Sequence, residues 1–333
     1  MRKITIVDIA KELDLSPSTV SRALNGTGRM NQATRQKVIE LAEKWHYHPN
    51  PHAQRLKKSK TLTIGLVVPE LTHHFYSQIV KGVDSILDVI GYQQIICVSN
   101  EEYEKEKNAV IALLNARVDG LLIALSNETK DYQHIQQIID EEIPLVFLDR
   151  TCEDIDAPYV TTNDFEGAKT AVKYLIELGC KHIGFIQGPE NISTTFNRLT
   201  GYKEALRANN MPLNEKLIVR HENQERFSQR LKEIVEVYHV DAILAHSDYH
   251  AFKAMKELQG MGYKIPEDLK IIGFADEPLA SYTTPTITTV KQPAFEIGRV
   301  GMEMLMAQLE SGVIGEPVML DTELIVRSST TQL

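Results

Sequence analysis

Residues 5–25, TIVDIAKELDLSPSTVSRALN, contain two short helical patterns separated by a tight turn. In the first pattern, apolar side chains recur at i, i+3, i+4 and i+7, as on one face of a helix: Ile6, Ile9, Ala10 and Leu13. Ser16 can cap a second helix, because its hydroxyl accepts a hydrogen bond from an unpaired backbone N–H, and Pro17 fits the first helical position. The spacing predicts a helix-turn-helix, whose second helix enters the major groove of DNA.

The second helix of this motif has an apolar side and a polar side. Val20, Ala23 and Leu24 turn inward, which leaves short polar groups and one guanidinium on the opposite face. Such a surface is suited to reading base edges. The candidate DNA-binding residues of this segment are Thr5, Ser16, Pro17, Ser18, Ser21, Arg22, Asn25 and Arg29.

A third helical pattern follows, and Asn31 is placed to cap it. Its apolar residues again repeat at i, i+3, i+4 and i+7: Val38, Leu41, Ala42 and Trp45. Three such stripes can close on one core, so any small three-helix bundle is also compatible with the pattern.

Charge favours DNA binding, because residues 1–60 carry twelve Lys/Arg and five Asp/Glu, a formal +7, whereas the whole chain carries −9.

The segment after Trp45 reads HYHPNPHAQRLKKSKT, in which Pro49 and Pro51 end the third helix. The basic residues that follow are compatible with a solvated tether between two domains. They are equally compatible with a DNA contact in which Leu56 inserts between base steps of the minor groove and kinks the duplex. These residues alone leave both interpretations open.

The chain has 333 residues, 43% of them hydrophobic, which is enough for more than one packed domain. The N-terminus has no signal-peptide pattern, and no apolar run approaches the ~20 residues that span a bilayer. We therefore expect a cytoplasmic protein with no membrane partner. Cys97, Cys152 and Cys180 are scattered without C-x-x-C spacing, which predicts neither a disulfide framework nor a zinc site.

From residue 61 onward, short apolar strands alternate with amphipathic helices. The expected strands are LTIGLVVP, QIICVS, GLLIAL, LVFLD, YVTT, HIGFIQG, AILAHS and LKIIGFAD. The expected helices cover residues 76–90, 104–116, 164–178, 199–209 and 249–261. This repetition predicts an α/β body of two doubly wound units in succession.

A parallel sheet binds ligands outside the carboxyl ends of its strands, and in this chain those positions are polar or aromatic. The candidate ligand-binding residues are His73, Phe75, Tyr76, Asp149, Arg198, Asp248 and Asp276. Carboxylates, a guanidinium and aromatic rings that face a cleft can bind hydroxyls and stack on a flat or sugar-like ring. Ordinary strand-end polarity is the competing interpretation; Asp164, for example, is placed to cap the helix that follows it.

Recognised catalytic motifs are missing from the sequence: we find no G-x-G-x-x-G, P-loop, G-x-S-x-G or H-E-x-x-H. The adjacent His73 and His74 do not belong to a pattern with metal-site spacing. We therefore expect a protein that is not an enzyme and that holds no metal or cofactor.

Several segments resemble the lactose-repressor (LacI/GalR) family of transcription regulators, and the resemblance runs from end to end. Residues 5–25 resemble its helix-turn-helix signature, and HPNPHAQRLKKSKT resembles its hinge. TIGLVVPELTHHFY resembles its first core strand and ligand loop, and GFADEPLASYTTPTITTVKQP with ELIVRSST resembles its late-core motifs. The resemblance implies an all-α helix-turn-helix head plus an α/β periplasmic-binding-protein-like core, whose two doubly wound subdomains are joined by three crossings.

The resemblance also implies domain boundaries. These are a DNA-binding domain over residues 1–48, a hinge over 49–60, a first core subdomain over 61–162 and 291–325, and a second over 163–290. An effector cleft lies between the two subdomains in this family.

Residue roles follow from the same resemblance. Pro17 and Ser18 match base-reading positions, Arg22 matches a groove contact, and Leu56 matches the hinge leucine that enters the minor groove. The implied effector contacts are His73, Phe75, Asp149, Arg198 and Asp248.

Two positions depart from the family pattern. The family commonly reads GFDD or GFDN where this chain has Gly273-Phe274-Ala275-Asp276, so Ala275 replaces an aspartate that usually contacts the ligand. His73 replaces the asparagine that is common after the first core strand. The effector of any one relative is therefore not transferable to this chain.

These observations predict a homodimeric transcription factor, a repressor, that binds a near-palindromic DNA operator and is controlled by a small-molecule effector. A sugar or sugar phosphate is the first choice of effector, and a purine or nucleoside is the alternative, because Phe75, Tyr76 and the histidines can stack on a base. No leucine heptads follow the last strand, which favours a dimer over a tetramer. A solute-binding protein and an α/β enzyme are the rival classes; the basic N-terminal segment opposes the first, and the missing catalytic motifs oppose the second.

Overall fold

The computed structural model describes residues 4–25, 30–45, 47, 60–152, 154–220 and 224–331. The chain divides into two units, Met1–Thr61 and Leu62–Leu333, which are considered separately. Within the described residues, no helix is both long and apolar enough to cross a membrane.

The described part of the N-terminal unit consists of three helices packed around one small core. They are α1 (Ile6–Glu12), α2 (Pro17–Asn25) and α3 (Gln32–Lys44). Each helix contributes one large aliphatic side chain with no exposed surface, namely Ile9, Val20 and Val38, and one buried alanine beside it. The three apolar stripes seen in the sequence therefore close on one another, as predicted.

Polar caps fix the starts of the second and third helices. The Ser16 hydroxyl accepts a hydrogen bond from the backbone N–H of Thr19 at 3.2 Å, which confirms the predicted start of α2. The Asn31 side chain accepts a hydrogen bond from the N–H of Ala33 at 2.9 Å, which confirms the predicted start of α3. Both caps satisfy helix N–H groups that have no partner within the helix.

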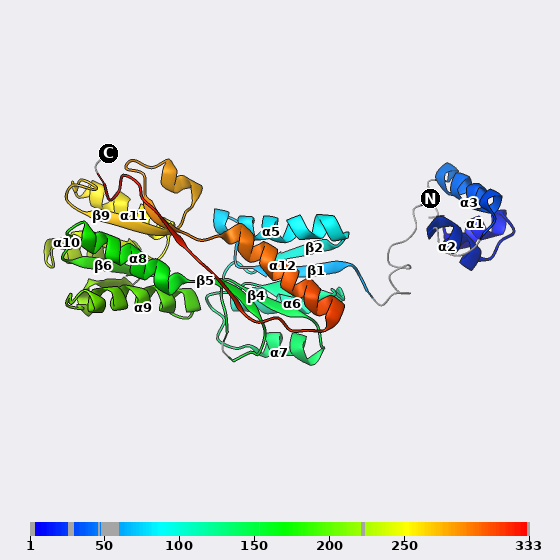
Figure 1. The fold of residues 1–333 in the computed structure, drawn as a ribbon, viewed down its shortest axis with the longest axis horizontal. Helices are drawn as coiled ribbons and strands as arrows, with labels where there is room; N and C mark the ends of the chain where they lie inside the picture. The colour runs from blue at the N-terminus through cyan, green and yellow to red at the C-terminus, as the bar shows by residue number, and fades with distance from the viewer. Residues whose placement is uncertain are drawn as a thin grey trace. The chain divides into compact units, whose positions relative to one another are not determined.

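The described residues of the C-terminal unit form two six-stranded sheets (Figure 1). The first sheet has the order β11-β5-β4-β3-β1-β2, and the second has the order β12-β10-β9-β8-β6-β7. The strands of the first sheet are β1 (Thr63–Val68), β2 (Gln93–Val98), β3 (Gly120–Ile123), β4 (Leu145–Leu148), β5 (Tyr159–Thr162) and β11 (Val318–Leu320). Those of the second are β6 (Ile183–Gln187), β7 (Ile218–Arg220), β8 (Ala242–Ala245), β9 (Lys270–Ala275), β10 (Thr288–Lys291) and β12 (Glu323–Ile325).

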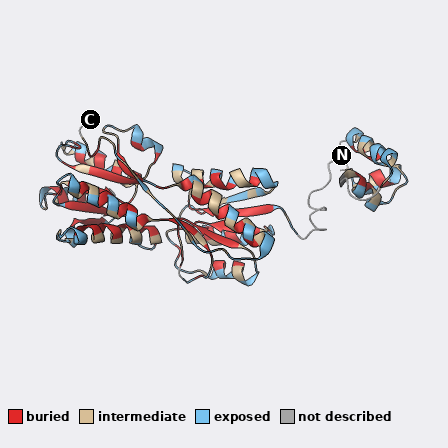
Figure 2. Cartoon of the chain, in the orientation of Figure 1, coloured by how far each residue is buried: buried red, intermediate tan, exposed pale blue. Residues whose placement is uncertain are grey.

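Helices cover both faces of each sheet. The first sheet lies between α5 (His74–Ile90) with α12 (Ala294–Ser311) and α6 (Tyr103–Asn115) with α7 (Gln133–Asp140). The second lies between α8 (Asp164–Glu177) with α9 (Ser193–Ala208) and α10 (Gln224–Glu236) with α11 (Asp248–Gly260). Figure 2 shows most of the strands buried between these helices. We call each sheet with its helices a lobe, the first and the second.

Both lobes follow one topology. In each sheet the first strand along the chain lies between the second and the third, as in β2-β1-β3 and β7-β6-β8. Among the described strands, all pairs are parallel except β10 with β12. The strand order thus reverses beside β1 and beside β6, and the carboxyl ends of strands at such a reversal are where open α/β sheets bind ligands. The prediction of two doubly wound units is confirmed.

The end of the chain differs from the expected boundaries. The segment predicted to return to the first subdomain covers residues 291–325, and α12 and β11 do join the first lobe. The last strand in that segment, β12, instead pairs antiparallel with β10 of the second sheet. This pairing covers the otherwise open edge of β10 with a further strand.

Two helices begin earlier than predicted. Helix α5 begins at His74 rather than at residue 76, and α9 begins at Ser193 rather than at residue 199. The first residues of α9, STTFN, have low helix propensity, but Thr194 and Thr195 are buried, so tertiary packing offsets that propensity. Consequently Arg198 lies inside α9 and does not open it. The sequence patterns also missed α7, α10 and α12.

Candidate functional site

A cleft of about 180 Å³ lies between the two lobes, at the carboxyl ends of their strands. Five of the predicted ligand-binding residues line it: His73, Phe75, Tyr76, Asp149 and Arg198. Other described lining residues were not predicted as contacts, among them Glu70, Glu101, Arg150, His246 and Glu277. The structure therefore brings residues from both lobes to one site.

Asp149 follows β4 and lies on the first-lobe side of the cleft. Its backbone has φ 65°, a left-handed conformation that turns the side chain out of the strand direction. The Tyr76 hydroxyl donates a hydrogen bond to Asp149 Oδ2 at 3.3 Å. Burial raises the pKa of Asp149 to about 6, because a carboxylate loses favourable hydration there.

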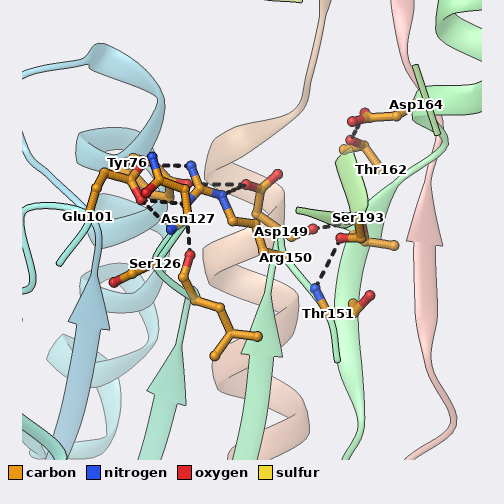
Figure 3. Close-up of polar contacts among 12 residues, drawn as sticks. Tyr76, Glu101, Ser126, Asn127, Asp149, Arg150, Thr151, Thr162, Asp164 and Ser193 are labelled. Carbon is orange, nitrogen blue, oxygen red and sulfur yellow. Dashed lines mark hydrogen bonds and ion pairs between the residues drawn. The ribbon is translucent and has the colours of Figure 1, made fainter. Parts of the chain in front are cut away.

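Arg150, the next residue, forms a bidentate ion pair with Glu101, as Figure 3 shows. Its Nη1 and Nη2 lie 2.8 and 2.9 Å from the two carboxylate oxygens of Glu101, and Nη1 also donates to the carbonyl of Leu125 at 2.8 Å. Glu101 in turn accepts a hydrogen bond from the N–H of Asn127 at 2.8 Å. The guanidinium thus ties the loops after β2 and β3 to the end of β4.

Arg198 forms the corresponding ion pair on the second-lobe side. Its Nε and Nη2 lie 2.9 and 2.8 Å from Asp164 Oδ2, and Nη1 donates to the carbonyl of His246 at 2.6 Å. The guanidinium also stacks on Phe274, with 3.8 Å from its carbon to the ring centroid. Arg198 is therefore buried and held from three sides.

The possible role of Asp164 as a helix cap is wrong. The cap of α8 is Asn163, whose side chain accepts a hydrogen bond from the N–H of Glu166 at 3.2 Å. Asp164 is buried, and besides its ion pair with Arg198 its Oδ1 accepts hydrogen bonds from Thr162 and Gln292. Burial raises its pKa, and the nearby Arg198 opposes that rise. Asp164 therefore positions Arg198.

Asp248 and Asp276 lie at strand ends as predicted, but their carboxylates bind protein groups. Asp248 is fully buried; its Oδ1 accepts from the Thr289 hydroxyl at 2.6 Å and its Oδ2 from the N–H of Glu277 at 2.7 Å. Asp276 pairs with Arg327 at 2.6 Å. Their predicted contact with an effector stays a prediction, and in this structure they brace the loop after β9.

Direct contacts join the two lobes across the cleft. The Glu277 carboxylate of the second lobe accepts hydrogen bonds from the N–H groups of His74 and Phe75, at 3.0 and 3.2 Å. His73 stacks on Tyr249, with ring centroids 3.9 Å apart. Thr151 of the first lobe also donates its N–H to Ser193 at 3.2 Å, as Figure 3 shows. The cleft is thus closed by protein groups from both sides.

Most of the predicted DNA-binding residues that the structure describes lie at the surface of the N-terminal unit. Thr5, Ser16, Pro17, Ser18 and Arg22 are exposed, and Ser21 is half-buried. The Ser16 hydroxyl bonds the hydroxyl of Ser18 at 2.8 Å, and Arg22 Nε donates to the carbonyl of Ser18 at 3.3 Å. Arg29, Leu56 and the side chain of Asn25 lie outside the described residues.

The comparisons with known proteins agree with this architecture. Residues 5–50 match the lacI family of bacterial regulatory proteins, and residues 172–330 match a periplasmic binding protein-like domain. The chain is 32% identical to the HTH-type transcriptional regulator DegA of Bacillus subtilis, over 99% of each chain. The chain belongs to the LacI family. It is thus a DNA-binding transcriptional regulator with a two-lobed allosteric core.

Solved LacI-family structures share the fold. The lac repressor dimer bound to operator and the anti-inducer ONPF superposes with a TM-score of 0.86 at 25% identity, covering 99% of this chain and 100% of that one. The transcriptional regulator CelR in complex with cellobiose gives a TM-score of 0.74 at 28% identity, covering 98% of this chain and 100% of that one.

Glu101, Asp164 and Glu277 are three of the site residues of this LacI-family chain whose roles sequence reasoning missed. Each acts on a partner that is distant in the sequence: Arg150, Arg198 and the start of α5, respectively. The only signal in the sequence was that each lies within a few residues of a strand's carboxyl end.

Proposed function

We propose that this LacI-family chain is a repressor that binds a near-palindromic operator as a homodimer. Binding of a carbohydrate in the cleft changes the affinity of the repressor for DNA. The observation that carries this proposal is the cleft itself, in which charged and aromatic side chains of both lobes converge at the strand ends. An effector that binds across two lobes changes their relative stability in open and closed arrangements, and so shifts the equilibrium between them.

A sugar is the effector class that the lining favours. Carboxylates and guanidinium groups bind hydroxyls, and Phe75 and Tyr76 add aromatic rings to the lining, on which a sugar can pack. The cellobiose in the related CelR structure supports the same class. A purine or nucleoside is the second candidate, which the aromatic rings of Phe75, Tyr76 and His73 in the lining favour, because an aromatic base can stack on such rings.

The homodimer is supported by an exposed apolar edge of the first sheet. Strand β2 lies at this edge, and Ile95 and Ile96 are 40% and 36% exposed there, while Val89 at the end of α5 is 83% exposed. A second copy of the chain that packs on this edge would cover it. The related lac repressor binds its operator as a dimer. We also propose that the protein acts in the cytoplasm, where DNA is accessible. It binds its effector without catalysing a reaction of it.

DNA reading by α2 has a direct test. We expect Arg22→Ala to lower affinity for operator fragments at least about fivefold, since one side chain that contacts a base is worth about 1–3 kcal/mol. The operators are first selected from genomic DNA with the full chain, and affinity is then measured by fluorescence anisotropy. Lys44→Ala, an exposed cation at the end of α3, is the control. Equal losses in the two variants would contradict the assignment.

Leu56, the hinge leucine of the proposal, lies outside the described residues, and its insertion into the minor groove stays a prediction.

A further inference from the structure

The cleft is richer in negative than in positive side chains. Its described lining includes four carboxylates and two guanidinium groups, and no lysine: Glu70, Glu101, Asp149 and Glu277 against Arg150 and Arg198. A phosphate group carries close to two negative charges at neutral pH. Its recognition in a protein therefore needs cations that are free to pair with it, and arginine is a frequent choice because it binds phosphate through two parallel hydrogen bonds.

Neither arginine carries an unpaired positive charge. Arg150 donates one N–H of each terminal nitrogen to the two oxygens of Glu101, and a further N–H of Nη1 to the carbonyl of Leu125. Arg198 is paired with the Asp164 carboxylate through Nε and Nη2, and its Nη1 donates to a backbone carbonyl. Arg198 is 5% exposed and Arg150 is 9% exposed, so these pairs are shielded from water. Each positive charge is already neutralised by a carboxylate of the protein.

Two buried polar atoms at the end of β4 have no hydrogen-bond partner among the described residues, although the second of them also lies 3.9 Å from Asp149 Oδ2, an ion-pair distance. One is the acceptor Oδ1 of Asp149, and the other is the donor Nε of Arg150. Buried polar atoms are nearly always hydrogen-bonded, so an unpaired acceptor and donor on consecutive residues indicate a missing group. A hydroxyl satisfies both atoms, because it donates to the carboxylate oxygen and accepts from the N–H. A phosphate dianion has no hydrogen to donate to Asp149.

From this charge balance and these two atoms we infer that the effector is an uncharged, hydroxyl-bearing molecule, and that the cleft rejects its phosphorylated counterpart. Asp149 Oδ1 and Arg150 Nε bind one of its hydroxyls, which assigns Arg150 a direct role in effector binding. Glu101 acts as a positioning residue that neutralises the rest of the guanidinium. The inference rests on the proposed function, since it concerns the same cleft, and narrows the ligand class.

Matched ligand pairs test the rejection of phosphate. The full chain is titrated at pH 8, where histidine side chains are mostly neutral, with ribose and ribose 5-phosphate, glucose and glucose 6-phosphate, cellobiose and cellobiose 6-phosphate, and adenosine and AMP. We expect the uncharged member of the binding pair to bind at least tenfold more tightly by calorimetry. Tighter binding of a phosphorylated member would overturn the inference. If no pair binds, the carbohydrate and nucleoside effectors of the proposed function fail, and the next experiment still decides the charge argument.

Inorganic phosphate probes the charge of the cleft without any effector. We expect about 20 mM phosphate to leave the Tm of the full chain unchanged against chloride of equal ionic strength, and to raise the Tm of Glu101→Gln by ~1 °C or more, because Arg150 then has a free charge. Glu104→Gln, an exposed carboxylate on α6, is the matched control and should behave as the unmodified chain. Stabilisation of the unmodified chain by phosphate, or no gain in Glu101→Gln, would overturn the assignment.

Discussion

The ionised Asp149 carboxylate, buried beside the cleft, lowers the free energy of unfolding of the chain. Burial raises its pKa from 3.8 to about 6, so the folded chain holds this proton more tightly than the unfolded chain does. Between about pH 4 and pH 6 the folded state therefore binds more protons, and the free energy of unfolding falls as the pH rises. Above pH 6 the carboxylate is ionised in both states, and the loss of stability is complete. The difference between the two pKa values corresponds to roughly 3 kcal/mol of unfolding free energy.

We expect Asp149→Asn to raise the Tm at pH 8, to flatten the fall in stability between pH 4 and pH 6, and to abolish effector binding. Thermal unfolding across this pH range, with calorimetry for the ligand, measures all three. Burial also raises the pKa of Asp248 to about 6. Because of Asp248, part of the fall in stability with rising pH persists in the variant. The exposed Asp156→Asn is the control. A lower Tm at pH 8 in Asp149→Asn would show that the carboxylate stabilises the fold.

At the scale of elements, the start of α5 depends on a residue from the other lobe. The N-cap residue His73 makes no side-chain hydrogen bond to the helix, and the N–H groups of His74 and Phe75 instead donate to Glu277. A negative charge at a helix N-terminus stabilises the helix by about 0.3–1 kcal/mol at an exposed site and by up to ~2 kcal/mol where it is partly buried. This contact thus couples the stability of α5 to closure of the cleft.

We expect Glu277→Gln to speed hydrogen exchange of the first-turn amides of α5 severalfold, because a neutral amide caps the helix more weakly and the cleft opens more often. Exchange measured by NMR or mass spectrometry on the ligand-free chain reports it. Asp276→Asn, which removes the adjacent carboxylate from its pair with Arg327, is the control. Unchanged exchange in Glu277→Gln, or equal changes in both variants, would refute the coupling.

At the scale of the whole molecule, the apolar edge at β2 predicts how two copies assemble. We expect Ile95→Lys to shift the chain towards monomer and to weaken operator binding, because a charge on an edge strand opposes packing and a monomer contacts one half-site. Analytical ultracentrifugation measures the first effect and anisotropy the second. Val237→Lys, at an apolar residue that is 62% exposed in the second lobe, is the control. If the Ile95→Lys variant remained a dimer, the interface between the two copies would not lie at β2.

The sequence by itself determined the elements whose signals are local. The helices of the N-terminal unit follow from apolar spacing and from caps that lie within three residues of the N–H groups they bind, as Ser16 and Asn31 do. The buried strands follow from continuous apolar runs between turns. The sequence also placed the site at the strand ends, since parallel βα units leave only that edge open for a ligand.

Only the tertiary structure decided which strand-end side chains face the cleft and what they bind. Whether a carboxylate turns into the cleft, as in Asp149, or towards the sheet, as in Asp248, depends on backbone torsions and on partners brought in by folding. The start of α5 was misplaced for the same reason, because its cap, Glu277, comes from the second lobe. Contacts between residues so far apart leave no periodic signal in the chain, and they exist only once both sheets have packed.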